Sequence, residues 1–314
     1  MEKYNFTETK DNIFWDEFIL QSENKNIYTL SDYLSLEDNI KFFIIKQTEE
    51  IIAAIALKVV NREIVPCKYL PQTPLIYKIN AESNDYKKNK TQQELIEAIK
   101  DFLLNNFNKG SFVLDFRTKD IRPFLWENKK KIDIINKYTL LIDLKKIDND
   151  DFAKSNLYKN FSPSKRKEIN RSEKENYKFI EKFSSNLFLQ LTKETYEMHG
   201  DFYDNIFYEK LIKKLKILNE KKFIKMFIIY KNDEVASFSV ISTINKFSMN
   251  LFYGRKNKFD KDRFLGTFMI RNIFKFLKKN NFKYFDFEGM NSPKNSFFKM
   301  SYGGSLTPYY KVIF

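Results

Sequence analysis

The sequence predicts an α/β fold made of two similar units, each a mixed, mostly antiparallel sheet flanked by helices. Short apolar segments with strand-like alternation are interspersed with longer segments whose apolar residues recur every three or four positions. The order of these segments in residues 1–146 is repeated, more distinctly, in residues 147–314. A polar stretch without periodicity, 145–151, is the best candidate for the domain boundary, the start of a helix being the alternative.

The composition is that of a folded, globular protein. The chain has 314 residues, of which 43% are hydrophobic and 17% aromatic, enough for two domains with sizeable cores. Its single cysteine, Cys67, cannot form an internal disulfide, and the start of the chain does not resemble a signal peptide. No apolar run approaches the roughly 20 residues that a membrane span requires. We therefore expect a cytoplasmic protein without a membrane span.

The formal net charge of the chain is +14. This charge favours an anionic partner, such as a nucleic acid, a phosphorylated substrate or an anionic membrane surface. The abundance of Lys, Asn, Ile and Phe is also what an AT-rich genome produces, and such a bias raises the number of lysines throughout a chain. The sequence leaves both explanations of the charge open.

The first half is expected to contain two short helices, a hairpin, a long helix and a strand, at 12–18, 31–34, 41–47 with 51–59, 91–107 and 111–117. The long helix has the clearest signals. Thr91 and Glu94 have the spacing of a capping box, and apolar residues follow at intervals of three and four. A hairpin, a crossing helix and further strands are typical of a compact α/β unit.

The second half is expected to begin with a basic helix, a strand, two helices and three antiparallel strands, at 162–176, 177–183, 186–198, 206–218, 223–230, 235–244 and 247–253. A helix, a strand, a short helix and a last strand complete it, at 264–279, 283–288, from Pro293 onward and 306–314. The polar segment 231–234 joins the first two antiparallel strands as a hairpin turn. Pro163 and Pro293 each stand in the first turn of a predicted helix.

The C-terminal segment from residue 282 carries the most distinctive pattern. Its strand alternates so that Asp286 and Glu288 lie on one side, at or near the strand end, and Gly289 follows at once. A short helix comes next, and Gly303-Gly304 ends it. Two carboxylates beside a strand end indicate a candidate functional site.

This segment resembles the C-terminal end of the Fem-like and related acyltransferases, which have the Gcn5-related N-acetyltransferase fold. The matching residues are Asp286-Phe287-Glu288-Gly289 and Phe298-Lys299-Met300-Ser301-Tyr302-Gly303-Gly304, where these proteins show Phe-Lys-x-x-Phe-Gly-Gly. Tyr302 replaces the Phe of that pattern. Residues 164–171 resemble a second common segment, Ser-x-x-x-Arg-x-x-Ile-x-x-Ala. The likeness in element order covers most of the chain, whereas the specific motifs lie in its second half.

The resemblance implies two tandem Gcn5-related N-acetyltransferase domains, 1–146 and 147–314, and the activity of an N-acyltransferase. The donor would be an acyl-CoA or another acyl thioester, including one on an acyl carrier protein, or alternatively an aminoacyl-tRNA. The acceptor would be an amine on a small molecule, a sugar, a nucleotide sugar or a cell-envelope precursor. The long helical hairpin that many tRNA-dependent relatives carry is not evident in the sequence. Direct attack by an amine needs no metal, and none is expected.

Four residues are candidates for catalysis. The Lys299 ammonium would stabilise the acyl carbonyl as it gains charge, and Asp286 and Glu288 would hold the acceptor amine and take its proton. His199, the only histidine, is a candidate base because its unperturbed pKa suits that role. Each has a structural alternative: a solvated lysine, carboxylates paired with lysines, and a histidine that caps a helix C-terminus.

Seven further residues are candidates for binding the substrate or the donor: Arg166, Lys167, Tyr253, Arg255, Tyr302, Gly303 and Gly304. The first two begin a basic helix that could grip a nucleotide diphosphate, a phosphopantetheine or a tRNA backbone, a solvated basic face being the alternative. Tyr302 could donate a proton or simply pack, and the glycines could approach a ligand or form a tight turn.

The loop after residue 255 departs from the pattern of many acetyl-CoA enzymes. Tyr253 and Arg255 end a strand that resembles the one meeting substrate in this fold. In those enzymes an Arg-x-x-Gly-x-Gly/Ala loop follows and cradles the pyrophosphate on backbone N–H groups. This chain offers Arg263 and Gly266 without that spacing.

A basic nucleic-acid-binding protein without catalytic activity is the alternative of a different class. The net charge suits it, but the sequence shows neither a recognition helix nor an array of stacking aromatic residues. An N-acyltransferase is therefore the function that we expect.

Overall fold

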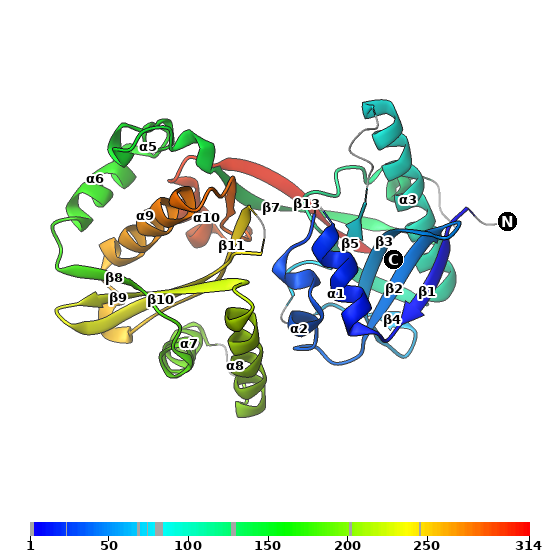
Figure 1. Cartoon of the computed structure of the whole chain (residues 1–314), viewed down its shortest axis with the longest axis horizontal. Helices are drawn as coiled ribbons and strands as arrows, with labels where there is room; N and C mark the ends of the chain where they lie inside the picture. Colours follow the sequence, from blue (N-terminus) through cyan, green and yellow to red (C-terminus); the bar gives the residue numbers. More distant parts are fainter. Residues whose placement is uncertain are drawn as a thin grey trace. The chain divides into compact units, whose positions relative to one another are not determined.

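The computed structural model describes residues 3–22, 24–67, 70–73, 75–78, 84–126, 130–200, 203–244 and 246–314, except for the side chains of His199 and Lys294. The chain forms two compact units: Met1–Lys137 with Pro308–Phe314 is unit 1, and Tyr138–Thr307 is unit 2 (Figure 1). The expected boundary between residues 146 and 147 falls within unit 2. The division of the chain differs from the expected one because β7 (Asp133–Asp143) runs from unit 1 into unit 2 and β13 (Ser305–Ile313) runs back.

Unit 1 contains, in chain order, β1 (Asn5–Thr9), α1 (Asn12–Gln21), η1 (Ile27–Thr29), α2 (Ser31–Leu34), β2 (Ile40–Gln47), β3 (Glu50–Val60), β4 (Glu63–Ile64), β5 (Leu75–Tyr77), α3 (Asp85–Asn106), β6 (Lys109–Leu114) and α4 (Arg122–Leu125). Its strands follow the order β1-β2-β3-β4-β6-β13, and β5 also pairs with β3. The pair of β4 and β6 is parallel, and the other neighbours run antiparallel.

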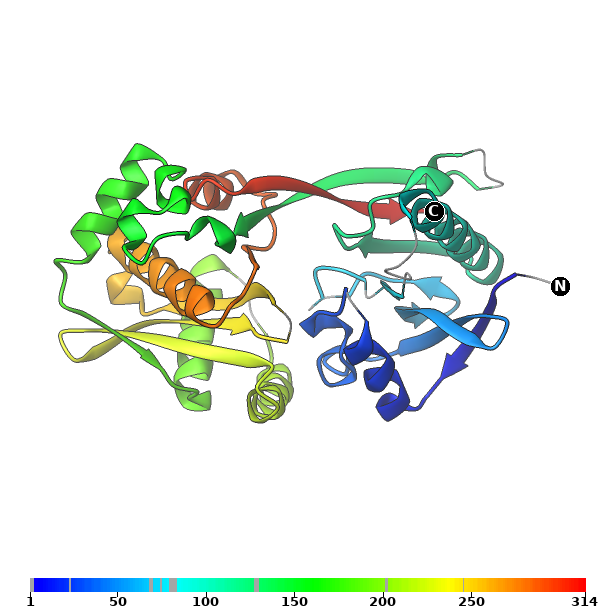
Figure 2. The same ribbon diagram turned by 45° about the horizontal axis from the view of Figure 1, so that its top comes forward.

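Successive side chains of the central strands point to opposite faces of the unit 1 sheet. Helices cover both of these faces (Figure 2). Phe43 belongs to one buried cluster with Leu95 of α3. Its neighbour Phe42 faces the other way and meets Trp15 of α1, with ring centroids 4.7 Å apart. Helix α3 begins before the expected residue 91, because the Asn84 side chain accepts the Lys87 N–H at 2.9 Å and caps it there.

Unit 2 contains, after β7, η2 (Leu144–Lys146), η3 (Phe152–Lys154), α5 (Asn156–Lys159), α6 (Pro163–Ser172), β8 (Tyr177–Glu181), α7 (Ser185–His199), α8 (Asn205–Glu220), β9 (Ile224–Lys231), β10 (Glu234–Ser242), β11 (Phe247–Arg255), η4 (Asn257–Phe259), α9 (Arg263–Lys279), β12 (Tyr284–Asp286), α10 (Pro293–Met300) and β13. The strands follow the order β7-β12-β11-β10-β9-β8. Strands β11 and β12 run parallel, and the other neighbouring pairs are antiparallel.

Helices cover both faces of the unit 2 sheet (Figure 1). Helix α9 packs on one face, where the rings of Phe274 and Phe285 lie 5.4 Å apart. Helices α7 and α8 cover the other, where Phe188 of α7 lies 5.3 Å from Phe238 of β10. The expected fold class, α/β with mixed, mostly antiparallel sheets flanked by helices, is confirmed. In the described part of the chain, every helix is too short or too polar to cross a membrane.

Candidate functional site

Strands β11 and β12 of unit 2 diverge soon after they begin to pair. Their parallel ladder joins only the first three residues of β11 to β12 and ends at Met249 and Asp286. Beyond that point the chain after β12 follows β7, since the Phe287 N–H donates to the Leu140 carbonyl at 3.1 Å. Strand β11 instead stays paired with β10 as far as Arg255. The sheet therefore opens at Asp286, and three of the candidate residues, Asp286, Glu288 and Lys299, come together there.

A left-handed bend begins at the buried carboxylate of Asp286. Its Oδ1 accepts hydrogen bonds from the Thr139 hydroxyl and, at 2.8 Å, from the Glu288 N–H. Glu288 and Gly289 both have positive φ, 52° and 47°. A residue other than glycine in this region costs on the order of 1–3 kcal/mol, so surrounding contacts must hold Glu288 in place.

Lys299 of α10 supplies those contacts. Its ammonium donates hydrogen bonds to the carbonyl of Glu288 and, at 2.8 Å, to that of Gly289. Burial lowers the pKa of Lys299, and the nearby charges of Glu288 and Asp286 oppose that shift. The structure thus brings together three of the four predicted catalytic residues, with the ammonium tied to the bend that carries the carboxylates.

The fourth predicted catalytic residue, His199, is the last residue of α7, and its side chain lies outside the described part of the structure. The helix ends at Gly200, which has a φ of 78° and donates its N–H back to Glu197. This is the usual geometry of a glycine helix end. The proposed role of His199 as a base stays a prediction.

Tyr302 and the glycine pair are packed tightly into unit 2. Tyr302 is completely buried against aromatic rings, including that of Phe287, and burial raises the pKa of its hydroxyl. A Cβ on Gly303, where φ is 65°, would lie 2.7 Å from the Asn160 carbonyl carbon. A Cβ on Gly304 would lie 2.7 Å from the Leu141 carbonyl oxygen. The close approach of two backbone segments thus accounts for both glycines without a ligand.

Tyr253, near the end of β11, faces the first turn of α9. A Cβ on Gly266 would lie 3.7 Å from the Tyr253 hydroxyl and 3.6 Å from the Phe298 ring of α10. Burial raises the pKa of Tyr253 to about 12. Arg255 forms an ion pair with Asp260 in the loop before α9. Tyr253 is therefore directed toward the region between α9 and α10, and Arg255 toward the loop.

Sequence reasoning missed Lys165, which is only 4% exposed although it lies in the basic helix α6. Its ammonium donates to Glu168 at 2.6 Å and to the Thr267 hydroxyl of α9 at 3.0 Å. It also lies 4.5 Å from the ring centroid of Phe298 and 4.9 Å from that of Tyr302. The buried Ile169, four residues on, shares its helix face and was the available sequence signal.

The two neighbours of Lys165, which were expected to bind the donor, occupy the outer part of α6. Arg166 is half-buried and donates to the Lys159 carbonyl of α5 at 3.3 Å, and Lys167 is exposed. Three successive basic residues thus have different environments, because successive positions on a helix point about 100° apart.

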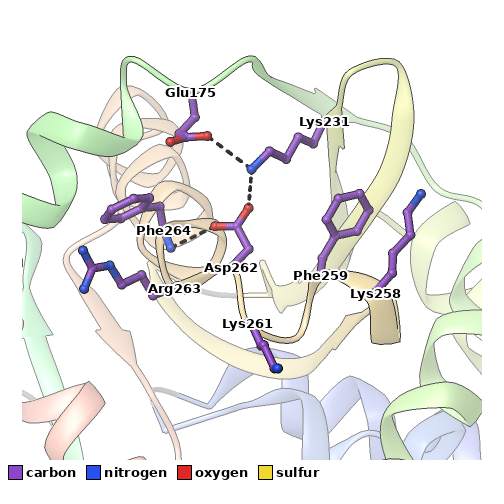
Figure 3. Close-up of a pocket in the computed structure, with 8 residues that line it drawn as sticks. All are labelled: Glu175, Lys231, Lys258, Phe259, Lys261, Asp262, Arg263 and Phe264. Atoms are coloured by element: carbon purple, nitrogen blue, oxygen red, sulfur yellow. Dashed lines mark hydrogen bonds and ion pairs between the residues drawn. The ribbon is translucent and has the colours of Figure 1, made fainter.

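A cavity of about 380 Å³ lies at the start of α9 (Figure 3), lined by Glu175, Lys231, Lys258, Phe259, Lys261, Asp262, Arg263 and Phe264. Asp262 caps the helix, its Oδ1 accepting the Phe264 N–H at 3.1 Å. Lys231 donates to Asp262 at 2.7 Å and pairs with Glu175 at 3.2 Å. The lining holds four cationic side chains and two carboxylates, which leaves a positive balance suited to an anionic group.

Comparisons with known proteins place the fold. No model of a protein family matches the chain, and no curated protein matches it in sequence. The crystal structure of FemX matches with 14% identity and a TM-score of 0.63 over 98% of this chain and 96% of that one. The structure of L-PGS from Bacillus licheniformis matches with 13% identity and a TM-score of 0.61 over 97% and 92%.

A tandem GNAT protein from the clavulanic acid biosynthesis pathway matches with 6% identity and a TM-score of 0.51 over 99% of this chain and 97% of that one. Identities this low establish likeness of fold and not of activity. Each of these matches covers almost the whole chain, both units included. The chain therefore has the tandem Gcn5-related N-acetyltransferase fold, as its resemblance to the Fem-like acyltransferases implied.

Proposed function

We propose that this protein is an N-acyltransferase that moves an acyl or aminoacyl group from an activated donor to the amine of an acceptor. The observation that carries the proposal is the position of the Lys299 ammonium, tied to the Glu288-Gly289 bend where β11 and β12 diverge. Transfer to an amine requires a base for the nucleophile and a donor for the developing oxyanion. The bend supplies both kinds of group within one small region.

Glu288 is the base in this proposal, and Asp286 is a positioning residue. Asp286 is completely buried, and its Oδ1 already accepts two hydrogen bonds that shape the bend. Glu288 is half-buried and lies next to it in the bend, where an acceptor amine can reach the carboxylate. The amine loses its proton to Glu288 as the nitrogen attacks the acyl carbon directly, so no acyl-enzyme forms.

Lys299 is the oxyanion donor. An ammonium has three N–H groups, and two of them are directed at the carbonyls of Glu288 and Gly289. The third is the one that would meet the acyl carbonyl oxygen. Because the two backbone bonds fix the nitrogen before the substrate arrives, little reorganisation is needed as charge develops on the oxygen.

Tyr253 is the proton donor to the leaving group. Its pKa of about 12 keeps the hydroxyl protonated at neutral pH, and it faces the first turn of α9, whose start borders the cationic cavity. A leaving thiolate or alkoxide that departs in that direction would receive the Tyr253 proton. Tyr302 is less suited to this role, because it is completely buried within the aromatic core.

The donors that suit this chemistry are acyl-CoA, an acyl thioester on a carrier protein, and aminoacyl-tRNA. All three are compounds of the cytoplasm, where we place the reaction. The acceptor is the amine of a sugar, a nucleotide sugar or a cell-envelope precursor. Glu288 would bind the amine of such an acceptor, and the positive charges of unit 2 would bind any phosphate that it carries.

A mass-spectrometric screen tests the proposal. The purified protein is incubated with each class of donor and a panel of amino sugars and their nucleotide derivatives, and acylated products are identified by mass. Lys299→Met serves as the inactive control, and Lys216→Met, an exposed change on α8, as the matched active one. The proposal predicts a product that forms with the wild type and with Lys216→Met only. Product formation at equal rates by all three proteins would contradict it.

A further inference from the structure

The start of α9 differs in a specific way from the place where many acetyl-CoA enzymes of this fold bind a diphosphate. There, free backbone N–H groups at the helix start cradle the anion. Here the chain fills that position with its own carboxylate: Asp262 is the N-cap, and its Oδ1 accepts the Phe264 N–H at 3.1 Å (Figure 3). The partial positive charge at the start of α9 is therefore already compensated by a carboxylate of the chain itself, that of Asp262.

Asp262 is fixed in this position by two further groups. The Tyr177 hydroxyl lies 2.7 Å from each of its oxygens, and Lys231 donates to it at 2.7 Å. Burial disfavours the charge of Asp262, but the bonds from Lys231 and Tyr177 outweigh it and hold its pKa below the ordinary value. The carboxylate is therefore ionised at neutral pH and held from three sides, so an incoming anion would have to displace it against several hydrogen bonds.

The residues around Asp262 also make the start of α9 unsuitable for a diphosphate. Glu175 is a second carboxylate on the cavity wall, and like Asp262 it pairs with Lys231. The segment 256–265, which comprises the residues before α9 and the first residues of that helix, contains no glycine, so side chains along it hinder the close backbone approach that a buried diphosphate requires. A diphosphate placed on the helix start would face these two carboxylates, whose combined negative charge exceeds the single positive charge of Lys231.

The other cationic side chains of the cavity are exposed. Lys261 and Arg263 flank Asp262 in the sequence, and Lys258, which also pairs with Glu234, lies on the opposite side of the opening (Figure 3). The Arg263 guanidinium lies 4.9 Å from the Phe264 ring centroid. Exposed cations bind phosphates at the surface largely through their charge, and the strength of such binding falls steeply with added salt.

We infer that the start of α9 does not hold a diphosphate on its backbone N–H groups, because Asp262 occupies that place, and that Lys258, Lys261 and Arg263 meet the anionic part of the donor from the surface. This inference rests on the proposed function for its identification of the ligand as the donor. It implies that free CoA binds weakly, through surface charge, and that a donor with an extended row of phosphates would gain more from the same side chains.

Calorimetric titration with CoA and with inorganic pyrophosphate, at low and at physiological salt, tests the inference without turnover. For the wild type we expect weak binding that salt removes and that Lys261→Gln/Arg263→Gln abolishes. Asp262→Ser keeps a helix-capping side chain but removes the fixed charge, and we expect at least tenfold tighter binding of pyrophosphate. Asp150→Ser is the charge control: it removes one negative charge from an exposed position of unit 2 outside the cavity lining, and should change the affinity less than threefold.

Salt-insensitive, micromolar binding of CoA by the wild type would overturn the inference, as would a loss of affinity in Asp262→Ser. Circular dichroism and thermal unfolding show whether Asp262→Ser folds; if it does not, the salt dependence and the Lys261→Gln/Arg263→Gln result still decide. Failure of the proposed function would give a different result. No donor would yield an acylated product, although the titrations would still give the results expected above.

Discussion

Asp115 in unit 1 and Asp286 in unit 2 form the same local structure. Each follows a long helix and stands after or at the end of a strand, and each accepts through Oδ1 the backbone N–H of the residue two positions later, at 2.7 Å and 2.8 Å. The two segments read Asp-Phe-Arg and Asp-Phe-Glu. In unit 1 the last residue of this triplet is Arg117, which neutralises Asp115 with two side-chain hydrogen bonds. In unit 2 the last residue is Glu288, which lies beside the ammonium of Lys299.

This difference predicts that the unit 1 carboxylate serves stability. Asp115→Asn should lower the free energy of unfolding by about 1.5–3 kcal/mol, because a buried, charge-assisted bond to Arg117 is lost. The folded variant should retain the kcat of the wild type. Urea unfolding together with steady-state kinetics measures both quantities. A variant that unfolds like the wild type but has lost its activity would show that unit 1 carries part of the catalytic site.

The variant Lys299→Met tests whether Lys299 takes part in catalysis or only attracts the substrate. A lost oxyanion donor costs roughly 2.7–4 kcal/mol, so kcat and kcat/KM should fall together by on the order of 100-fold or more. A lysine that only attracts an anionic substrate would instead raise KM, leave kcat nearly unchanged, and lose its effect as salt is added. Steady-state kinetics at two ionic strengths decides between these outcomes, with Lys299→Arg as the variant that keeps the charge.

The lowered pKa of Lys299 predicts an alkaline limit to activity. The ammonium is the active form, so kcat should fall as pH rises through a value below the ordinary 10.5. Glu288→Gln removes a negative charge that raises this pKa, so its residual activity should fall at still lower pH. Between the lowered pKa and 10.5 the folded state binds fewer protons than the unfolded state, so the contribution of Lys299 to stability rises with pH there. A pH profile of kcat that is flat to pH 10.5 would contradict the assignment.

Two glycines with similar backbone angles provide a matched pair. Gly303 and Gly200 have φ values of 65° and 78°. A Cβ at Gly303 would collide with the backbone of Asn160, whereas no atom of the described residues lies within 4 Å of a Cβ at Gly200. Gly200→Ala should therefore cost only about 1 kcal/mol, the usual penalty of left-handed backbone. Gly303→Ala should cost several times as much, seen as a much lower urea midpoint. Equal costs would mean that the close approach of Asn160 is not needed for stability.

Lys165 and Lys167 form a second matched pair within α6. Lys165→Met removes the bonds to Glu168 and Thr267 and should lower the free energy of unfolding by about 1.5–3 kcal/mol. It should also lower kcat, because Lys165 holds the Phe298 ring next to Lys299 in sequence. Lys167→Met, at an exposed position, should change neither quantity. Partial recovery of kcat in Lys165→Arg would separate the effect of the charge from that of packing alone.

The sequence by itself determined the class of fold and the centre of the candidate site. The periodicities of the apolar residues predicted most of the elements within a few residues, because burial of one face imposes a repeat of two on strands and of three to four on helices. No bounds were predicted for β1 or β7, and α3 begins six residues before its expected start at residue 91. Lys299, Glu288 and Asp286 could be grouped in advance because they lie within 14 residues of one another, in a strand, bend and helix whose order limits how far apart they can be.

Only the tertiary structure decided what depends on residues distant in the chain. The return of Pro308–Phe314 to unit 1, the collision that requires Gly303 and the burial of Lys165 each follow from contacts between segments whose pairing no local pattern specifies. The cap at Asp262 is visible in sequence, but its fixation by Tyr177 and Lys231 is not. A side chain's charge and shape are local properties, whereas its burial, its partners and therefore its pKa are set by whatever the fold brings against it.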